Sequence, residues 1–513
     1  MNRKPILLLL LFIPLLGSAQ KKNKQAVTAA STITAADMKK HLYIIASAEM
    51  GGRDTPSPGL EKAADYIEAH FKSLGLVPGN NGSYRQHYPL YRDSMVSTHL
   101  RINESPFEVN TDFQPGTGYN HSAEMRFSEA VFVGYGIADG TIDNYSGIDV
   151  QGKLVIIADG LPAGYKTPAG QRNPGNMGAK MNTAAKKGAA AILVVSTNFP
   201  RKNLASSGSW SMNGYKASVN PFTFSVSENV LKTIMKEDAT GIWERLKDNT
   251  AQSKVYRADI DLSYVKQTVT TQVSNVLGLL EGTDLKDEYV VLTAHYDHVG
   301  KRNDTTIFYG ADDDGSGTTG ILELAEAFVK AKQSGNGPRR SILFMTVSGE
   351  EKGLWGSRYY ANNPVYPLEK TTVDLNIDMI GRTGSEYLKD KDSTNYIYII
   401  GDDKISSDLA VITDQVNNTY SKLKLDRKYN DPNDPNRFYF RSDHYNFADK
   451  GVPIIFYFNG THADYHRPTD TPDKINYPMM AKRTQLVFHT AWEMANRNEM
   501  LKRDIKLEKP KGF

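Results

Sequence analysis

Apolar and polar residues follow an alternating pattern from about residue 272 onward, where Val/Ile/Leu-rich runs are separated by segments with helical spacing. The apolar runs occupy 275–282, 288–298, 341–351, 374–382, 396–402 and 452–460, and the helical segments occupy 320–331, 405–421 and 478–497. Near-continuous apolar strands alternating with amphipathic helices are typical of an α/β domain whose sheet is covered on both faces. The pattern predicts a mixed, mostly parallel sheet sandwiched by helices.

A different texture covers residues 96–265. Short β-like runs such as 129–137 and 153–160 are split by turn residues, and one helix-like piece falls within 181–195. This predicts a small β-rich domain inserted into the α/β domain.

The inserted domain would separate two parts of the α/β domain, 35–95 and 266–513. In the first part, Ala63, Ile67, Phe71 and Leu74 recur at the spacing of an amphipathic helix. Two domains also suit the length of 513 residues, which exceeds what one hydrophobic core usually serves.

Residues 1–19 have the pattern of a cleaved secretory signal. Arg3 and Lys4 precede an apolar run of about a dozen residues, and the small residues Gly17 and Ala19 follow it. The run is shorter than the roughly 20 residues that span a bilayer, so we expect no stable membrane insertion. We expect export to the periplasm or the medium, and a flexible leader over 20–34.

Composition narrows the classes of function. The 61 basic and 58 acidic residues give a formal net charge of +3, so no excess positive field would attract nucleic acid or anionic lipid. The chain has no cysteine, which excludes Cys-type zinc sites and cysteine proteases. Nothing in the sequence indicates an oligomeric state.

Residues that bind divalent cations well cluster where the predicted strands end. They are His295, Asp297 and His298; Glu350 and Glu351; Asp378; His466; and the Asp312–Asp314 run before a predicted helix. Each fragment alone has an ordinary explanation, such as a hydrogen-bonded His–Asp pair, acids facing a helix dipole, or a turn. Their co-occurrence at strand ends of one α/β domain predicts a shared site, because such sites form at those ends. Two histidines with three carboxylates and no sulfur suit a pair of zinc ions and hydrolysis.

Six motifs in this half of the chain carry a family resemblance. They are TAHYDHVG (293–300), GADDDGSG (310–317), SGEEKGLWGSRYY (348–360), NIDMIGR (376–382), FRSDHYNF (440–447) and DYHRPTDTPDKI (464–475). In order and spacing they resemble the zinc aminopeptidases of peptidase family M28, which implies a zinc-peptidase, phosphorylase/hydrolase-like fold. Three stretches of the middle region, 129–137, 143–160 and 184–195, resemble the protease-associated (PA) domain often inserted in such peptidases.

The resemblance implies a ligand set for two Zn²⁺ ions. His295 and Asp378 would hold one ion, Glu351 and His466 the other, and Asp313 would bridge them. Cobalt or manganese are alternatives to zinc.

The resemblance also implies roles for four residues beside the ligands. Glu350 matches the general base, and Asp297 matches the acid that orients a histidine ligand. Tyr465 matches a donor to the oxyanion in some members, and Arg441 matches a position that contacts substrate.

The function that follows is removal of N-terminal residues from peptide substrates by a metal-activated water. A carboxypeptidase or dipeptidase of the same fold is the nearest alternative. A one-zinc glutaminyl cyclase and a non-catalytic binding homologue are further alternatives, and the complete set of five ligand positions favours neither.

Overall fold

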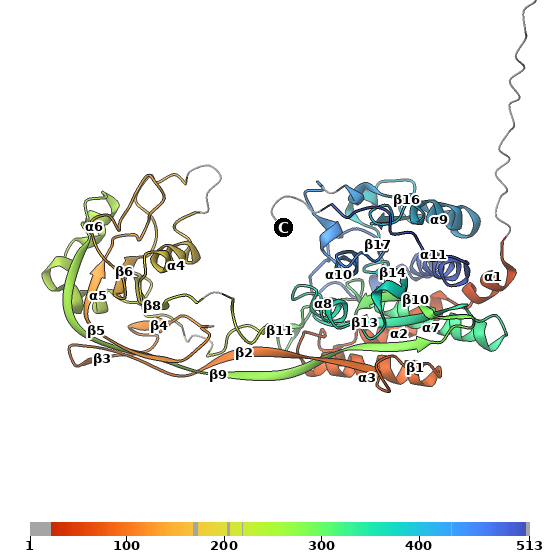
Figure 1. The fold of residues 1–513 in the computed structure, drawn as a ribbon, viewed down its shortest axis with the longest axis horizontal. Coiled ribbons are helices and arrows are strands. Elements are labelled where there is room, and N and C mark those ends of the chain that lie inside the picture. Colours follow the sequence, from red (N-terminus) through yellow and green to blue (C-terminus); the bar gives the residue numbers. More distant parts are fainter. Residues whose placement is uncertain are drawn as a thin grey trace, which may run out of the picture. The chain divides into compact units, whose positions relative to one another are not determined.

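The computed structural model describes residues 22–117, 119–167, 173–202, 206–217, 219–431 and 433–508. The chain divides into two compact units, one made of Met1–Tyr88 with Gln272–Phe513 and the other of Pro89–Thr271. The second unit starts earlier and ends later than the predicted 96–265. The reason is that two long strands, β2 (Arg85–Ile102) and β9 (Lys254–Leu280), run uninterrupted past both predicted boundaries (Figure 1).

The first unit is built on a sheet with the strand order β16-β15-β17-β14-β10-β13-β9. The central strands β10, β13, β14 and β17 are mutually parallel, whereas β9 is antiparallel to β13 and β15 is antiparallel to β17. The edge strand β16 is parallel to β15. The strands are β1 (Val77–Pro78), β10 (Leu285–His295), β11 (Lys301–Asn303), β12 (Thr306–Ile307), β13 (Arg340–Val347), β14 (Thr371–Ile377), β15 (Tyr396–Ile400), β16 (Lys424–Asp426) and β17 (Ile454–Phe458). The predicted mixed, mostly parallel sheet is therefore confirmed.

Helices flank this sheet (Figure 1). Helices α7 and α11 pack against β10, β13 and β14, and α10 packs against β14 and β17. The helices are α1 (Lys24–Ala30), α2 (Ala35–Ile45), α3 (Pro58–Ser73), α7 (Gly315–Gln333), α8 (Trp355–Asn362), α9 (Leu409–Val416), α10 (His444–Ala448) and α11 (Tyr477–Asn496). Helix α7 is buried on nearly every side, as expected of a helix apolar all round. The helix predicted from Ala63, Ile67 and Phe71 is α3, which buries all three.

Part of the expected flexible leader is ordered, and the prediction of flexibility is wrong for Lys24–Ala30. These residues form α1, which packs against α7 and α11. Asn23 caps the helix by accepting a 2.9 Å hydrogen bond from Ala26 N. Ala26, Ala29 and Ala30 are buried, because their small side chains allow close approach. Residues 1–19 lie outside the described part of the chain, so the signal peptide stays a prediction.

The second unit contains the strands that follow β9 in the same sheet, in the order β9-β5-β6-β7-β8-β4. Its other elements are β3 (Ser105–Phe107), β4 (Phe113–Pro115), β5 (Ala123–Phe132), β6 (Leu154–Ala158), β7 (Ala191–Val195), β8 (Phe222–Val226), α4 (Met177–Lys186), α5 (Glu228–Met235) and α6 (Ile242–Lys247). Strands β5 to β8 are parallel, and the predicted helix-like piece is split between α4 and β7. Its assignment to the PA type stays a prediction.

Short 3₁₀ or π turns complete the two units: η1 (Ala48–Met50), η2 (Lys236–Ala239), η3 (Leu368–Lys370), η4 (Ser385–Tyr387), η5 (Asn417–Ser421), η6 (Lys428–Asn430), η7 (Phe438–Phe440) and η8 (Pro472–Lys474). Among the residues that the structure describes, no helix combines the length and apolar character needed to cross a bilayer.

Candidate metal centre

The parallel strands of the first unit bring their carboxyl ends to one edge of the sheet. His295 is the last residue of β10, and its register partner is Val347 at the end of β13. Asp378 directly follows β14, which is paired in parallel with both β10 and β17. Glu350 and Glu351 lie just beyond β13 and His466 in the segment after β17. Chain direction alone therefore collects the predicted polar residues in one region.

The three consecutive aspartates before α7 have different partners. Asp312 Oδ1 accepts a 2.6 Å hydrogen bond from Gly381 N, and Asp314 Oδ1 accepts a 3.0 Å bond from Met379 N. These two bonds tie the loop to the chain segment that follows β14. Asp313, between them, turns its carboxylate to the histidines. This arrangement supports Asp313 as the bridging residue.

One donor set surrounds Asp313 Oδ1. His295 Nε2 lies 3.3 Å from that oxygen and 3.6 Å from Asp378 Oδ1. Glu350 Oε2 lies 3.9 Å from the same His295 nitrogen. All four residues are buried or nearly so. The structure thus brings together the residues predicted for the first ion, with the predicted base beside them.

The second donor set surrounds Asp313 Oδ2. His466 Nε2 lies 2.9 Å from that oxygen and 3.0 Å from Glu351 Oε1. His298 also belongs to this set, because its Nδ1 lies 2.9 Å from Glu351 Oε1 and 3.8 Å from Asp313 Oδ2. The sequence analysis placed His298 near the site without a role. The one feature of the sequence that could have indicated His298 as a metal donor is its position in the run His295–Asp297–His298.

The two sets fit a pair of divalent ions. Several of the facing atoms are buried and make no hydrogen bond of acceptable geometry with any described residue: His295 Nε2, His298 Nδ1, Asp313 Oδ2, Glu351 Oε1 and His466 Nε2. Buried polar atoms normally have partners, so their shared lack of one calls for an explanation. Donors bonded to tetrahedral zinc at about 2.0–2.1 Å lie roughly 3.3 Å apart. The separations of 2.9–3.9 Å bracket that value.

The pKa shifts of Glu350 and His295 show that a charge on either side chain is unfavourable unless an opposite charge lies beside it. Burial raises the pKa of the Glu350 carboxyl well above its ordinary value, although His295 opposes that shift. Burial also disfavours the charged imidazole of His295, but the carboxylates of Glu350, Asp378 and Asp313 together raise its pKa well above normal. The concentration of carboxylates therefore favours a positive partner at this point.

His295 is oriented through Asp297, but the contacting atom differs from the expected one. The imidazole Nδ1 lies 3.1 Å from the backbone carbonyl oxygen of Asp297, whereas the nearer carboxylate oxygen is 3.7 Å away. The carboxylate instead accepts hydrogen bonds from Glu350 N at 3.2 Å and from Thr55 Oγ1 at 3.1 Å. Asp297 thus orients the His295 ring through its backbone carbonyl oxygen, and it positions Glu350, the predicted base, through its side chain.

Tyr465 and Arg441 lie together at the second set. The Tyr465 ring stacks on His466 with centroids 4.0 Å apart, and its hydroxyl accepts a 3.2 Å hydrogen bond from Arg441 Nη2. His466 has a φ of 53°, and Met379, which follows Asp378, has a φ of 62°. Such left-handed backbone in non-glycine residues is uncommon and clusters at functional sites.

Arg53 is a second residue that sequence reasoning missed. It is fully buried and donates hydrogen bonds of 2.7–2.9 Å to the carbonyl oxygens of Ile45, Tyr296, Tyr309 and Gly310. It therefore joins the segment after β10 to the loop that precedes Asp312. An arginine in a Gly-rich loop carries no sequence signal for such burial.

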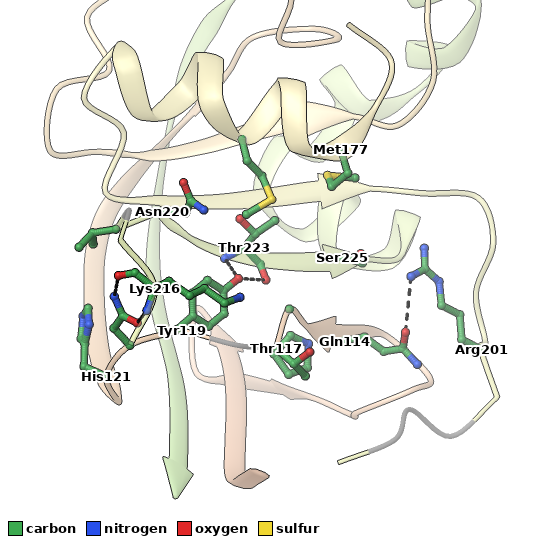
Figure 2. Close-up of a pocket in the computed structure, with 15 residues that line it drawn as sticks. Gln114, Thr117, Tyr119, His121, Met177, Arg201, Lys216, Asn220, Thr223 and Ser225 are labelled. Carbon is green, nitrogen blue, oxygen red and sulfur yellow. Dashed lines mark hydrogen bonds between the residues drawn. The ribbon is translucent and has the colours of Figure 1, made fainter. Parts of the chain in front are cut away.

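The second unit contains a separate pocket of about 280 Å³ (Figure 2). His121, Arg201 and Lys216 contribute basic side chains to its wall, and the Tyr119 hydroxyl accepts a 2.7 Å hydrogen bond from Thr223 N. None of the described lining residues is acidic, so this pocket offers no carboxylate donor for a metal.

The fold places two groups of possible metal donors at one edge of an α/β sheet, as a metal-dependent hydrolase requires. Residues 275–491, somewhat less than half of the chain, match the model of peptidase family M28. The fold is shared with the aminopeptidase from Aneurinibacillus sp. strain AM-1, at 20% sequence identity and a TM-score of 0.52, covering 94% of this chain and 100% of that one.

Two curated relatives illustrate the range of similar proteins. A probable leucine aminopeptidase of Arthroderma otae is 28% identical over 270 residues, which are 48% of this chain and 70% of that protein. A probable glutamate carboxypeptidase of Arabidopsis thaliana is 34% identical over 120 residues, which are 23% of this chain and 16% of that protein. The similarity thus spans anything from a small part to about two thirds of these relatives.

Proposed function

We propose that the protein is an aminopeptidase that hydrolyses N-terminal residues from peptides with two Zn²⁺ ions and Glu350 as the base. The observation that carries this proposal is the Asp313 carboxylate, which turns one oxygen to each donor set. One set then holds an ion with His295 and Asp378, and the other holds an ion with Glu351 and His466. When bound, such a pair lowers the pKa of a water and stabilises negative charge on the carbonyl oxygen.

The chain's own residues have distinct tasks in this scheme. Glu350 accepts the proton of the attacking water and passes it to the leaving amine. The Asp297 carboxylate accepts a hydrogen bond from the backbone N–H of Glu350, and this bond fixes the position of the base. The Arg441 guanidinium donates a hydrogen bond to the Tyr465 hydroxyl and so fixes its position. The Tyr465 O–H can then donate to the carbonyl oxygen of the substrate as that oxygen gains negative charge.

Cleavage at the amino end is supported by the extent of the similarity. The relatives named leucine aminopeptidase match 48% and 41% of this chain, whereas those named glutamate carboxypeptidase match 23% and 24%. A carboxypeptidase or dipeptidase of the same fold is the alternative. An aminopeptidase and a carboxypeptidase differ in whether the peptide substrate must have a free amino terminus.

The deciding experiment compares zinc-loaded protein on matched peptides with free or acetylated amino termini. An aminopeptidase cleaves the free peptide and loses nearly all activity on the acetylated one. Equal cleavage of both, with the C-terminal residue released first, would instead establish the carboxypeptidase.

Glu350→Gln tests the base within the same assay. The amide cannot accept the water's proton, so we expect kcat to fall by about 10²–10⁴-fold. Zinc content by mass spectrometry should stay unchanged, because Glu350 is assigned no ion. Glu369→Gln, at an exposed position, is the control and should retain full activity. Substantial turnover by Glu350→Gln would remove this residue from the role of base.

A further inference from the structure

A second group of nitrogen and oxygen donors lies among three helices of the first unit. His41 is on α2, His70 is on α3, and Glu323 and Glu326 are one turn apart on α7. The His41 Nε2 atom lies 3.4 Å from Glu326 Oε1 and 3.7 Å from Glu323 Oε1. His70 Nε2 lies 3.5 Å from the same Glu326 oxygen. None of these residues belongs to the candidate metal centre described above.

Two of the donor atoms have no hydrogen-bond partner among the described residues. They are His70 Nε2 and Glu323 Oε1, and both are buried atoms. The Glu323 side chain is only 1% exposed, so water does not replace the missing partner from outside. A buried carboxylate oxygen and an imidazole nitrogen that face one group without partners indicate a missing positive centre.

The remaining contacts orient the donors toward a common point. Tyr66 Oη lies 2.7 Å from His41 Nδ1, and when that nitrogen donates its hydrogen, Nε2 presents its lone pair to the carboxylates. Lys330 donates a 3.0 Å hydrogen bond to Glu326 Oε2, which leaves Glu326 Oε1 for the histidines. The two imidazole rings meet edge to face, with centroids 4.7 Å apart.

We propose that His41, His70 and Glu326 bind a further Zn²⁺ ion, with Glu323 as a fourth donor. The donor separations of 3.4–3.7 Å are close to the roughly 3.3 Å expected between ligands of tetrahedral zinc. Two neutral imidazoles and two carboxylates balance the charge of one divalent ion.

Such an ion would have a structural role, because side chains from three different helices would hold it. It would join α2 and α3 to α7, the helix whose amino end follows the Asp312–Asp314 loop (Figure 1). The proposal is independent of the peptidase assignment, since it uses neither the catalytic residues nor a substrate.

The test measures bound zinc per chain in the full-length protein after dialysis against buffered zinc. His70→Gln removes one donor, and His489→Gln is the matched control at another buried histidine, on α11, that belongs to no donor group. We expect His70→Gln to hold one equivalent less than the control. The same comparison in the Asp313→Ala background, which lacks the bridging carboxylate, should give one equivalent for the control and none for His70→Gln.

A second readout separates loss of the ion from loss of the fold. In the Asp313→Ala background, added zinc should raise Tm by several degrees, and His70→Gln should abolish that rise while circular dichroism stays unchanged. If His70→Gln does not fold, Glu326→Gln replaces it, because its amide is a poor zinc ligand. Equal zinc content in the His70 and control variants, or no zinc-dependent rise in Tm, would overturn the proposal.

Discussion

Asp313 stands out at the scale of single residues because its carboxylate is the only one of three adjacent aspartates that faces the histidines of both donor sets. One oxygen of Asp312 and one of Asp314 each accept a hydrogen bond from a backbone N–H beyond β14, and the other Asp312 oxygen lies 3.1 Å from His462 Nε2. The same residue type therefore serves two purposes within one loop. Asp312 and Asp314 fix the loop, and the rigid loop holds the Asp313 carboxylate between the two sets.

Asp313→Ala removes the only oxygens shared by the two sets, so we expect about two equivalents of zinc to be lost together. The matched control is Asp314→Asn, whose side-chain oxygen can still accept from Met379 N and Gly317 N. Mass spectrometry of metals after gel filtration measures both variants. Loss of a single equivalent from Asp313→Ala would show that the carboxylate serves one ion and is not a bridge.

His298 gives the second donor set one more side chain than the first. Its ring packs against Gly310, where an added Cβ would come within 2.5 Å of the imidazole, so only glycine allows this approach. The second set thus offers His298, Asp313, Glu351 and His466, whereas the first offers His295, Asp313 and Asp378. A fuller set of protein donors favours tighter retention of the ion, and a less complete set leaves a position open.

We therefore expect His298→Gln to weaken one zinc selectively. A chelator titration of the unaltered protein should release the two ions of the centre in separate steps, the tighter one from the second set. In His298→Gln the tighter step should move by at least about tenfold in affinity. His87→Gln, at an exposed position, serves as the control. If both steps stay where they were, His298 does not act on the ion.

At the scale of elements, the sheet edge explains why most of the site could be predicted from the sequence. Apolar runs identify the parallel strands, and parallel strands place the residues after them at one edge. His295, Glu350, Glu351 and Asp378 each follow such a run, so their proximity is a consequence of topology. His466 is harder to place from the pattern of apolar runs, because it lies eight residues beyond the end of β17, and its role as a ligand came from the family resemblance.

Other features depend on contacts that no periodic pattern records. Helix α1 is short and polar on its outer side, and only its alanines against α7 and α11 hold it in place. Likewise the β-rich texture of 96–265 indicates only part of α4 and neither α5 nor α6, which are short helices of 8 and 6 residues. Local pattern reading is weak where a segment is stabilised by distant partners.

Arg53 links two loops of the first unit, and its substitution should be costly. Arg53→Met would leave four carbonyl oxygens without their donor, so we expect the free energy of unfolding to fall by about 3 kcal/mol or more. Urea unfolding followed by circular dichroism measures the change. Arg302→Met, at an exposed position, should change stability by less than about 0.5 kcal/mol. A loss as small as in this control would mean that water satisfies the four carbonyls.

At the scale of the whole molecule, the two units differ in the chemistry they can perform. The first unit contains every group of donors that could hold a metal ion within the described residues. The second unit offers a pocket with basic and hydrogen-bonding groups instead.

We propose that residues 1–19 direct export of the chain and are then removed. Cleavage after Ala19 would leave Gln20 as the first residue, because small residues at positions 17 and 19 suit a signal peptidase. Expressed in a bacterium, the unaltered chain should therefore appear in the periplasm or medium with an intact mass lacking these 19 residues. Ala19→Arg should block processing, whereas Gln25→Arg, beyond the cleavage point, should not. Recovery of the full-length mass from the membrane fraction would instead show that residues 1–19 are retained as an anchor.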